Sequence, residues 1–216
     1  MVTAEIEPPK ADLYNHKLVI AVDGDWERPL LNARAARQAQ QDAYGLYLNV
    51  GGMLWLMGRR TFEGQELRMG RKDFGVNDDN NPLPYTYLNL SAEFAGPAPG
   101  AYRFAEFVGA TAIISGFPDL ETDTLHVSQT SLGGYRYSRA LLGVNYAIRM
   151  NESEPLYKYV AINPDTSQFH NFPVAIRYDS GSFKTSYFTF PLYFIQTDQA
   201  IEVTRQMLQW FFPNGR

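Results

Sequence analysis

The stretch that decides the expected fold runs from KLVIAV at residues 17–22 to MLWLM at residues 53–57. Both runs are apolar throughout rather than alternating, which is typical of strands buried on both faces in a parallel sheet. Between them, Leu30–Asn49 has an amphipathic helical pattern, with apolar positions three or four apart at Ala36, Ala39, Ala43 and Tyr47. The glycines at residues 51–52 suit the end of that helix. Strand, helix and strand in this order predict a βαβ unit.

The C-terminal part of the chain predicts a β-hairpin followed by a helix. Pro173–Tyr178 and Phe183–Phe190 have the composition of strands, and the DSGS link between them supplies a turn. Asp198–Phe212 has helical spacing. The apolar face of this helix is wide, because Ile201 and Leu208 join the positions that would face a core.

The composition indicates a folded domain of ordinary size. The chain has 216 residues, of which 45% are hydrophobic, 14% aromatic and 19% charged, and this excludes intrinsic disorder. The net charge of −4 disfavours nucleic acid and anionic membrane surfaces as partners. The patterns weaken into expected loops from Gly58 to Gly100. We expect an N-terminal extension, residues 1–12, and a single α/β domain, residues 13–216.

Several classes of protein are excluded by what the sequence lacks. There is no cysteine, so disulfides, thiolate metal sites and cysteine nucleophiles are ruled out. The first residues have neither the basic nor the apolar segment of a signal peptide. The apolar runs are far shorter than the roughly 20 residues needed to cross a bilayer, so no membrane span is expected.

The order of these elements resembles a known superfold. The segments LYNHKLVIAV, MLWLMG, AIRY, FKTSYFTFPLYFI and MLQWFF follow one another as in flavodoxin-like domains of the class I glutamine-amidotransferase-like group. The chain looks most like members of that group found in long, often cell-surface, bacterial proteins. The resemblance implies a mostly parallel sheet flanked by helices, with a late β-hairpin and a C-terminal helix. It also implies an extracellular or cell-envelope location, with other domains or subunits of a larger protein as partners.

Two departures from that group bear on function. The position of its nucleophilic cysteine falls at Gly58, so the chemistry of the group is not transferred to this chain. Such domains also begin with a further strand and helix, whereas only residues 1–12 precede the matching stretch here. Either the first βα unit is missing or the chain is a fragment, and another chain could supply that unit.

Polar residues follow two neighbouring strands of the expected sheet. Asp23 and Asp25 come after the first strand, and Arg59 and Arg60 after the second. Ligands of open α/β sheets bind outside the carboxyl ends of the strands, so these four residues form a hypothetical ligand-binding site. The carboxylates could bind a divalent cation or act as acid and base. The guanidinium groups could bind an anion or form surface ion pairs.

Motifs of known enzyme classes are absent. There is no Gly-x-Ser-x-Gly elbow, no zinc-binding HExxH and no phosphate-binding P-loop. The remaining catalytic alternative is a metal-assisted hydrolase or transferase that uses the carboxylates at the strand ends, or Ser115 with His126. No metal site and no cofactor are expected.

Tyrosines provide a second alternative, because many occur in pairs two residues apart, at positions 85 and 87, 135 and 137, and 157 and 159. Such pairs lie on one face of a strand, where they either stack on sugar rings or pack in a core. The sequence therefore predicts a non-catalytic module, a scaffold or a binder of a small polar ligand or glycan. A metal-assisted enzyme and a carbohydrate-binding module are the alternatives.

Overall fold

In the computed structural model the described residues are 10–23, 43–59, 61–62, 70–75, 83–95, 106–128, 140–141 and 143–214. The helical elements are α1 (Lys10–Leu13), residues 43–49, η1 (Leu83–Tyr87), α3 (Thr124–Ser128), η3 (Leu192–Phe194) and α4 (Thr197–Phe211). The strands are β1 (Leu18–Asp23), β2 (Met53–Gly58), β3 (Gly70–Asp73), β4 (Leu90–Ala95), β5 (Phe107–Ala112), β6 (Leu120–Glu121), β7 (Tyr146–Arg149), β8 (Glu154–Ala161), β9 (Pro173–Asp179) and β10 (Lys184–Phe188).

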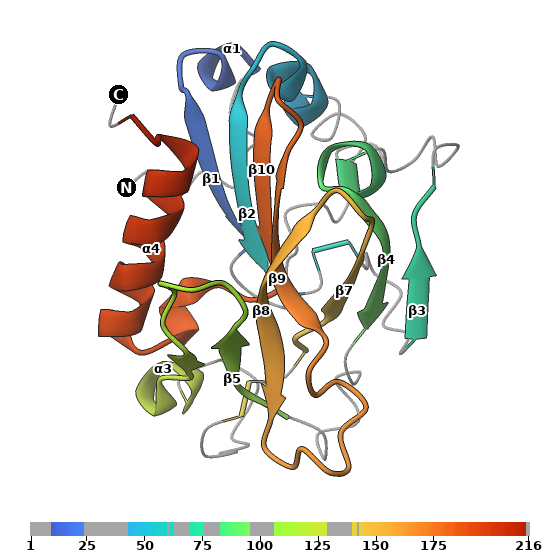
Figure 1. Ribbon diagram of the computed structural model, residues 1–216, viewed down its shortest axis with the longest axis vertical. Helices are drawn as coiled ribbons and strands as arrows, with labels where there is room; N and C mark the ends of the chain where they lie inside the picture. The colour runs from blue at the N-terminus through green and yellow to red at the C-terminus, as the bar shows by residue number, and fades with distance from the viewer. Residues whose placement is uncertain are drawn as a thin grey trace.

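The main structural element is a seven-stranded mixed sheet in the order β1-β2-β10-β9-β8-β5-β6. The pairs β1–β2 and β2–β10 are parallel, and every other neighbouring pair is antiparallel. Figure 1 shows this sheet curled into a half-barrel, with α4 along one side. A separate antiparallel sheet, β3-β4-β7, lies beside it and contacts it through β7 and β9.

The expected fold class is therefore wrong, and so is the resemblance from which it was drawn. The protein is not a flavodoxin-like parallel sheet flanked by helices but a strand-rich, curled, mixed sheet. The parallel pairing of β1 with β2, the hairpin β9–β10 and the helix α4 are as predicted. The difference arises because β8, β9 and β10 are joined in antiparallel order, and the apolar pattern of a strand does not specify the direction of its neighbour.

Strand β2 lies between two hydrophobic cores, which explains why its sequence is apolar at every position. Trp55 and Met57 point into one core, which they share with Val203 and Met207 of α4. Leu54 and Leu56 point into a second core, which includes side chains from residues 43–49 and from the small sheet. Because successive side chains alternate across a strand, burial on both faces requires an apolar residue at every position.

The turn into β2 depends on Tyr47 and the glycines after it. Gly51 has φ +89°, which favours glycine at the end of the helical residues 43–49. The single O–H of Tyr47 has two acceptors within reach, the carbonyl oxygens of His16 (3.0 Å) and Met53 (3.2 Å), and the hydroxyl oxygen accepts from the Met53 N–H (3.1 Å). The tyrosine ring lies directly against Gly52, where any side chain would collide with it.

The segment expected to be loops also contains regular structure. Strands β3 and β4 and the helical turn η1 all lie between Gly58 and Gly100. Strand β4 was not recognised because its sequence, LSAEFA, places a charged residue at a buried position, Glu93. The Tyr187 hydroxyl donates to Glu93 Oε1 at 2.6 Å, which supplies the partner that a buried carboxylate requires.

Candidate functional site

The sequence-predicted site lies where the parallel strands end. Asp23 ends β1 and pairs in register with Gly58, which ends β2 and precedes Arg59. The backbones of these two strand ends are therefore neighbours. The side chain of Asp23, and all of Asp25 and Arg60, lie outside the described residues. Their proposed roles remain predictions.

Arg59 is buried, with 3% of its surface exposed. Its guanidinium carbon lies 4.9 Å from the centre of the Phe194 ring, which is the arrangement of a cation–π contact. The sequence had placed Arg59 at the surface, facing either a ligand or acidic neighbours. Its burial instead makes it part of the support beneath η3.

The short helix η3 connects Arg59 to the surface. Pro191 precedes it, and the Ile195 N–H donates to the Leu192 carbonyl oxygen at 3.0 Å. The Phe194 carbonyl oxygen accepts from the Asp123 N–H at 2.7 Å, and Ile195 forms a β-bridge with Thr122. These contacts hold η3 in place between β10 and α4.

A shallow apolar groove lies between η3 and the first turns of α4, with a volume of about 350 Å³. We call it the α4–η3 groove. It is lined by Leu192, Tyr193, Ile195, Thr197, Ala200, Ile201 and Thr204. Tyr193 is 45% exposed and Ile201 64% exposed, so the groove is open to solvent at large apolar side chains. The Tyr193 and Phe194 ring centres are 4.2 Å apart. Phe194 therefore contacts both Tyr193, which lines the groove, and Arg59, which lies beneath it.

Polar groups contribute little to the α4–η3 groove. Three of its seven lining residues carry hydroxyls, Tyr193, Thr197 and Thr204. The Thr204 hydroxyl donates to the Ala200 carbonyl oxygen at 2.8 Å, so its hydrogen is used within the helix. The groove is therefore suited to apolar groups rather than to a polar ligand.

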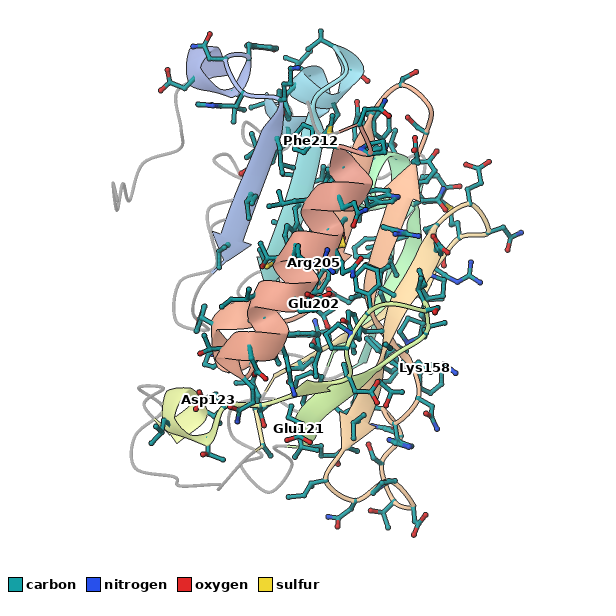
Figure 2. The ribbon with its side chains drawn as sticks, turned by 60° about the vertical axis from the view of Figure 1, so that its left-hand side comes forward. Glu121, Asp123, Lys158, Glu202, Arg205 and Phe212 are labelled. Atoms are coloured by element: carbon teal, nitrogen blue, oxygen red, sulfur yellow. The ribbon has the colours of Figure 1, made fainter. Side chains whose placement is uncertain are left out.

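The sequence contained one signal for this groove. The apolar face of α4 was wider than a single buried stripe requires, because it included Ile201 and Leu208. Val203, Met207 and Phe211 form the buried stripe, whereas Ile201 and Leu208 are exposed. Figure 2 shows α4 lying across the sheet, with Glu202 and Arg205 on its middle turns.

The tyrosine pair in β8 belongs to the core. Tyr157 and Tyr159 are both buried, and the Tyr157 hydroxyl donates to the Pro118 carbonyl oxygen at 3.0 Å. Burial raises the pKa of both phenols above the usual value, and the nearby carboxylate of Asp119 raises the pKa of Tyr157 further. These two rings are therefore not available to stack on a sugar.

The catalytic alternatives depend largely on residues outside the described part of the chain. Within the described ranges, no three histidine, aspartate or glutamate side chains are grouped closely enough to hold a metal ion. Ser115 is exposed in the turn after β5, and the side chain of His126 lies outside the described residues. No helix in the described part of the chain is long and apolar enough to cross a membrane.

Comparison with known proteins gives similarity of fold only. No protein-family model matches this chain. No curated protein matches it either. Among solved structures, a cytoplasmic protein from Salmonella typhimurium is 12% identical with a TM-score of 0.48, and the match covers 95% of this chain and 76% of that one.

Two β-galactosidases also match. The polyextremophilic enzyme from the Antarctic haloarchaeon Halorubrum lacusprofundi is 17% identical with a TM-score of 0.50, over 94% of this chain and 23% of that one. The enzyme from Rahnella sp. R3 is 12% identical with a TM-score of 0.47, over 91% and 23%. This chain thus spans about a quarter of the length of either β-galactosidase, and the low identities establish no shared activity.

Proposed function

We propose that this chain is a non-catalytic assembly module, which binds an apolar segment of another domain or subunit in the α4–η3 groove. The observation that supports this proposal is the exposure of Tyr193 and Ile201 around an open, almost wholly apolar surface. Fully burying one such side chain contributes about 1.5–3 kcal/mol. A partner that covers both residues therefore gains a useful part of its binding free energy here.

The chemistry of the groove favours a protein segment over a small polar ligand or glycan. A sugar or a charged metabolite requires several hydrogen-bond partners to replace the water that it loses. The lining residues of the groove carry three hydroxyls, those of Tyr193, Thr197 and Thr204, and the Thr204 hydroxyl already donates its hydrogen to the helix backbone. Leucine-like or aromatic side chains of a partner require no such replacement.

The fold comparisons are compatible with a module of a larger assembly. In the haloarchaeal β-galactosidase, the stretch with this fold makes up 23% of a longer chain. Likeness of fold does not transfer that enzyme's activity. It does support the narrower inference that this arrangement of strands occurs as one part of a larger protein.

The proposal is tested by titrating the 216-residue protein with the apolar fluorescent probe bis-ANS. Replacing Ile201 with Gln removes an exposed apolar side chain from the groove while keeping a residue that favours helix. We expect the probe to bind about tenfold more weakly to this variant, which corresponds to about 1.4 kcal/mol. The melting temperature should be unchanged, since Ile201 is exposed.

Ile162→Gln is the matched control, because Ile162 is also exposed but does not line the groove. Its affinity for the probe should equal that of the unmodified protein. Equal binding by all three proteins would show that the groove is not the apolar binding surface. The same conclusion would follow if Ile162→Gln weakened binding as much as Ile201→Gln.

A further inference from the structure

Strand β1 forms one end of the seven-stranded sheet and, among the described residues, pairs with β2 alone. The outer edge of such a strand presents backbone N–H and C=O groups that can pair with another strand. Natural proteins usually protect such edges with charged residues, proline or a bulge. The sequence of β1, LVIAVD, has no charge and no proline before Asp23, and its pairing with β2 is regular throughout.

Two large side chains of β1 are exposed on one face. Ile20 is 45% exposed and Val22 43% exposed. They pair in register with Trp55 and Met57, so they lie on the same side of the sheet as those residues. β-Branched residues favour the pleated surface of a sheet, and here they lie at its edge.

The sequence of β1 is complementary to itself in one antiparallel register. If Ile20 of one copy lies opposite Ile20 of another, Leu18 lies opposite Val22 and Val19 opposite Ala21. The exposed apolar residues of both copies then share one face. Lys17 lies opposite Asp23 at each end, and opposite charges in such pairs are stabilising. A slip of one residue would put Ile20 and Val22 of one copy on the opposite face of the joined sheet from Ile20 and Val22 of the other copy.

We propose that β1 is the interface for a second copy of this chain, with the two β1 strands paired antiparallel about a two-fold axis at Ile20. This would join the two seven-stranded sheets into one continuous sheet. The contact is isologous, because the same surface is used by both copies. It is independent of the α4–η3 groove, since none of the groove-lining residues belongs to β1.

Disulfide trapping tests this register directly, because the chain has no cysteine of its own. In the proposed dimer, Ile20→Cys places two thiols opposite each other, with Cβ atoms about 4.5–5.5 Å apart. Small adjustments then allow a disulfide. Val22→Cys is the matched control, since each Val22 faces Leu18 of the other copy. Its two thiols would lie four residues apart along the strands, about 13 Å, which is too far for a disulfide.

Both variants are oxidised at several protein concentrations, and the unmodified chain is examined by sedimentation velocity. We expect the unmodified chain to dimerise as concentration rises, and Ile20→Cys to form a covalent dimer much faster than Val22→Cys. Lys17→Glu should weaken dimerisation, and Lys17→Glu combined with Asp23→Lys should restore it. A monomer at every concentration, or equal crosslinking of the two cysteine variants, would overturn the proposal.

Discussion

The guanidinium carbon of Arg59 lies 4.9 Å from the centre of the Phe194 ring, beneath the surface that carries the α4–η3 groove. Arg59, which the sequence predicted to bind a ligand, thus packs against Phe194 beneath the groove instead of facing solvent. The contact joins the end of β2 to η3, two segments more than 130 residues apart in the chain. A desolvated cation–π contact of this kind is worth about 2 kcal/mol.

We predict that Phe194→Leu lowers the free energy of unfolding by about 2 kcal/mol, because leucine fills much of the space but cannot attract the guanidinium group. Urea unfolding followed by circular dichroism measures the change. Tyr193→Leu is the comparison, since Tyr193 is half-exposed and faces the groove. It should cost much less, and an equal cost for both substitutions would argue against the Arg59 contact.

Gly52 is predicted to tolerate no side chain. A Cβ atom there would lie 2.4 Å from the Tyr47 ring, and that ring is held by the hydrogen bonds of its hydroxyl. Gly52→Ala should therefore destabilise the protein by about 1–3 kcal/mol, the usual cost of overpacking. Gly75→Ala provides the control, because a Cβ atom at Gly75 meets nothing within 4 Å. A thermal melt in which both variants match the unmodified protein would contradict this packing.

Stability is predicted to fall as the pH rises above 10. Burial raises the pKa of the Tyr157 and Tyr159 phenols in the folded protein, whereas the unfolded chain has the usual value of 10.0. The unfolded state therefore loses its protons first, so this stabilisation is complete below pH 10 and declines above it. Urea midpoints at pH 8, 10 and 11 measure the effect. Midpoints that do not change over this range would contradict the burial of both hydroxyls.

Glu202 is predicted to titrate at unusually low pH. The hydrogen bond from Arg205, followed by that from Gln206, lowers the pKa of Glu202 from 4.5 to about 2. The ion pair therefore stabilises the folded state above pH 4.5, and this stabilisation is lost as the pH falls toward 2. Because the pair is at the surface, its effect on stability should be small. Carboxyl NMR shifts should show the pKa returning toward 4.5 in Arg205→Met, and an unchanged pKa would exclude the contact.

The sequence predicted local structure well and the joining of that structure poorly. Four local patterns were recognised: the apolar runs of β1 and β2, the turn between β9 and β10, and the helical spacing of α4. Each of these patterns depends only on residues close together in the sequence. The antiparallel pairing of β8 with β9 and β5 depends on contacts between segments far apart in the sequence, and the hydrophobic pattern within one segment does not specify such contacts. Inferring a parallel flavodoxin-like sheet from one βαβ pattern was therefore wrong.

The candidate site was also predictable where it depends on local patterns and not where it depends on long-range contacts. Proximity of the ends of β1 and β2 followed from parallel pairing, which local patterns can predict. The burial of Arg59 did not, because the ring that covers it comes from η3. The only sequence signal for the groove was the wide apolar face of α4, where Ile201 lies beyond the buried stripe and lines the groove. Exposure of such residues can be measured only once the helix is placed against the sheet.

The most direct test of the assembly role is a methyl NMR spectrum of isoleucine-labelled protein during titration with bis-ANS. Ile195, which is buried, and Ile201, which is exposed, line the groove, whereas Ile20, Ile113 and Ile162 are exposed elsewhere. We predict that the Ile195 and Ile201 methyl signals shift together and saturate at one concentration, while those of Ile113 and Ile162 remain unchanged. Shifts at Ile113 and Ile162 with none at Ile195 and Ile201 would contradict the account, because the apolar binding surface would then lie elsewhere.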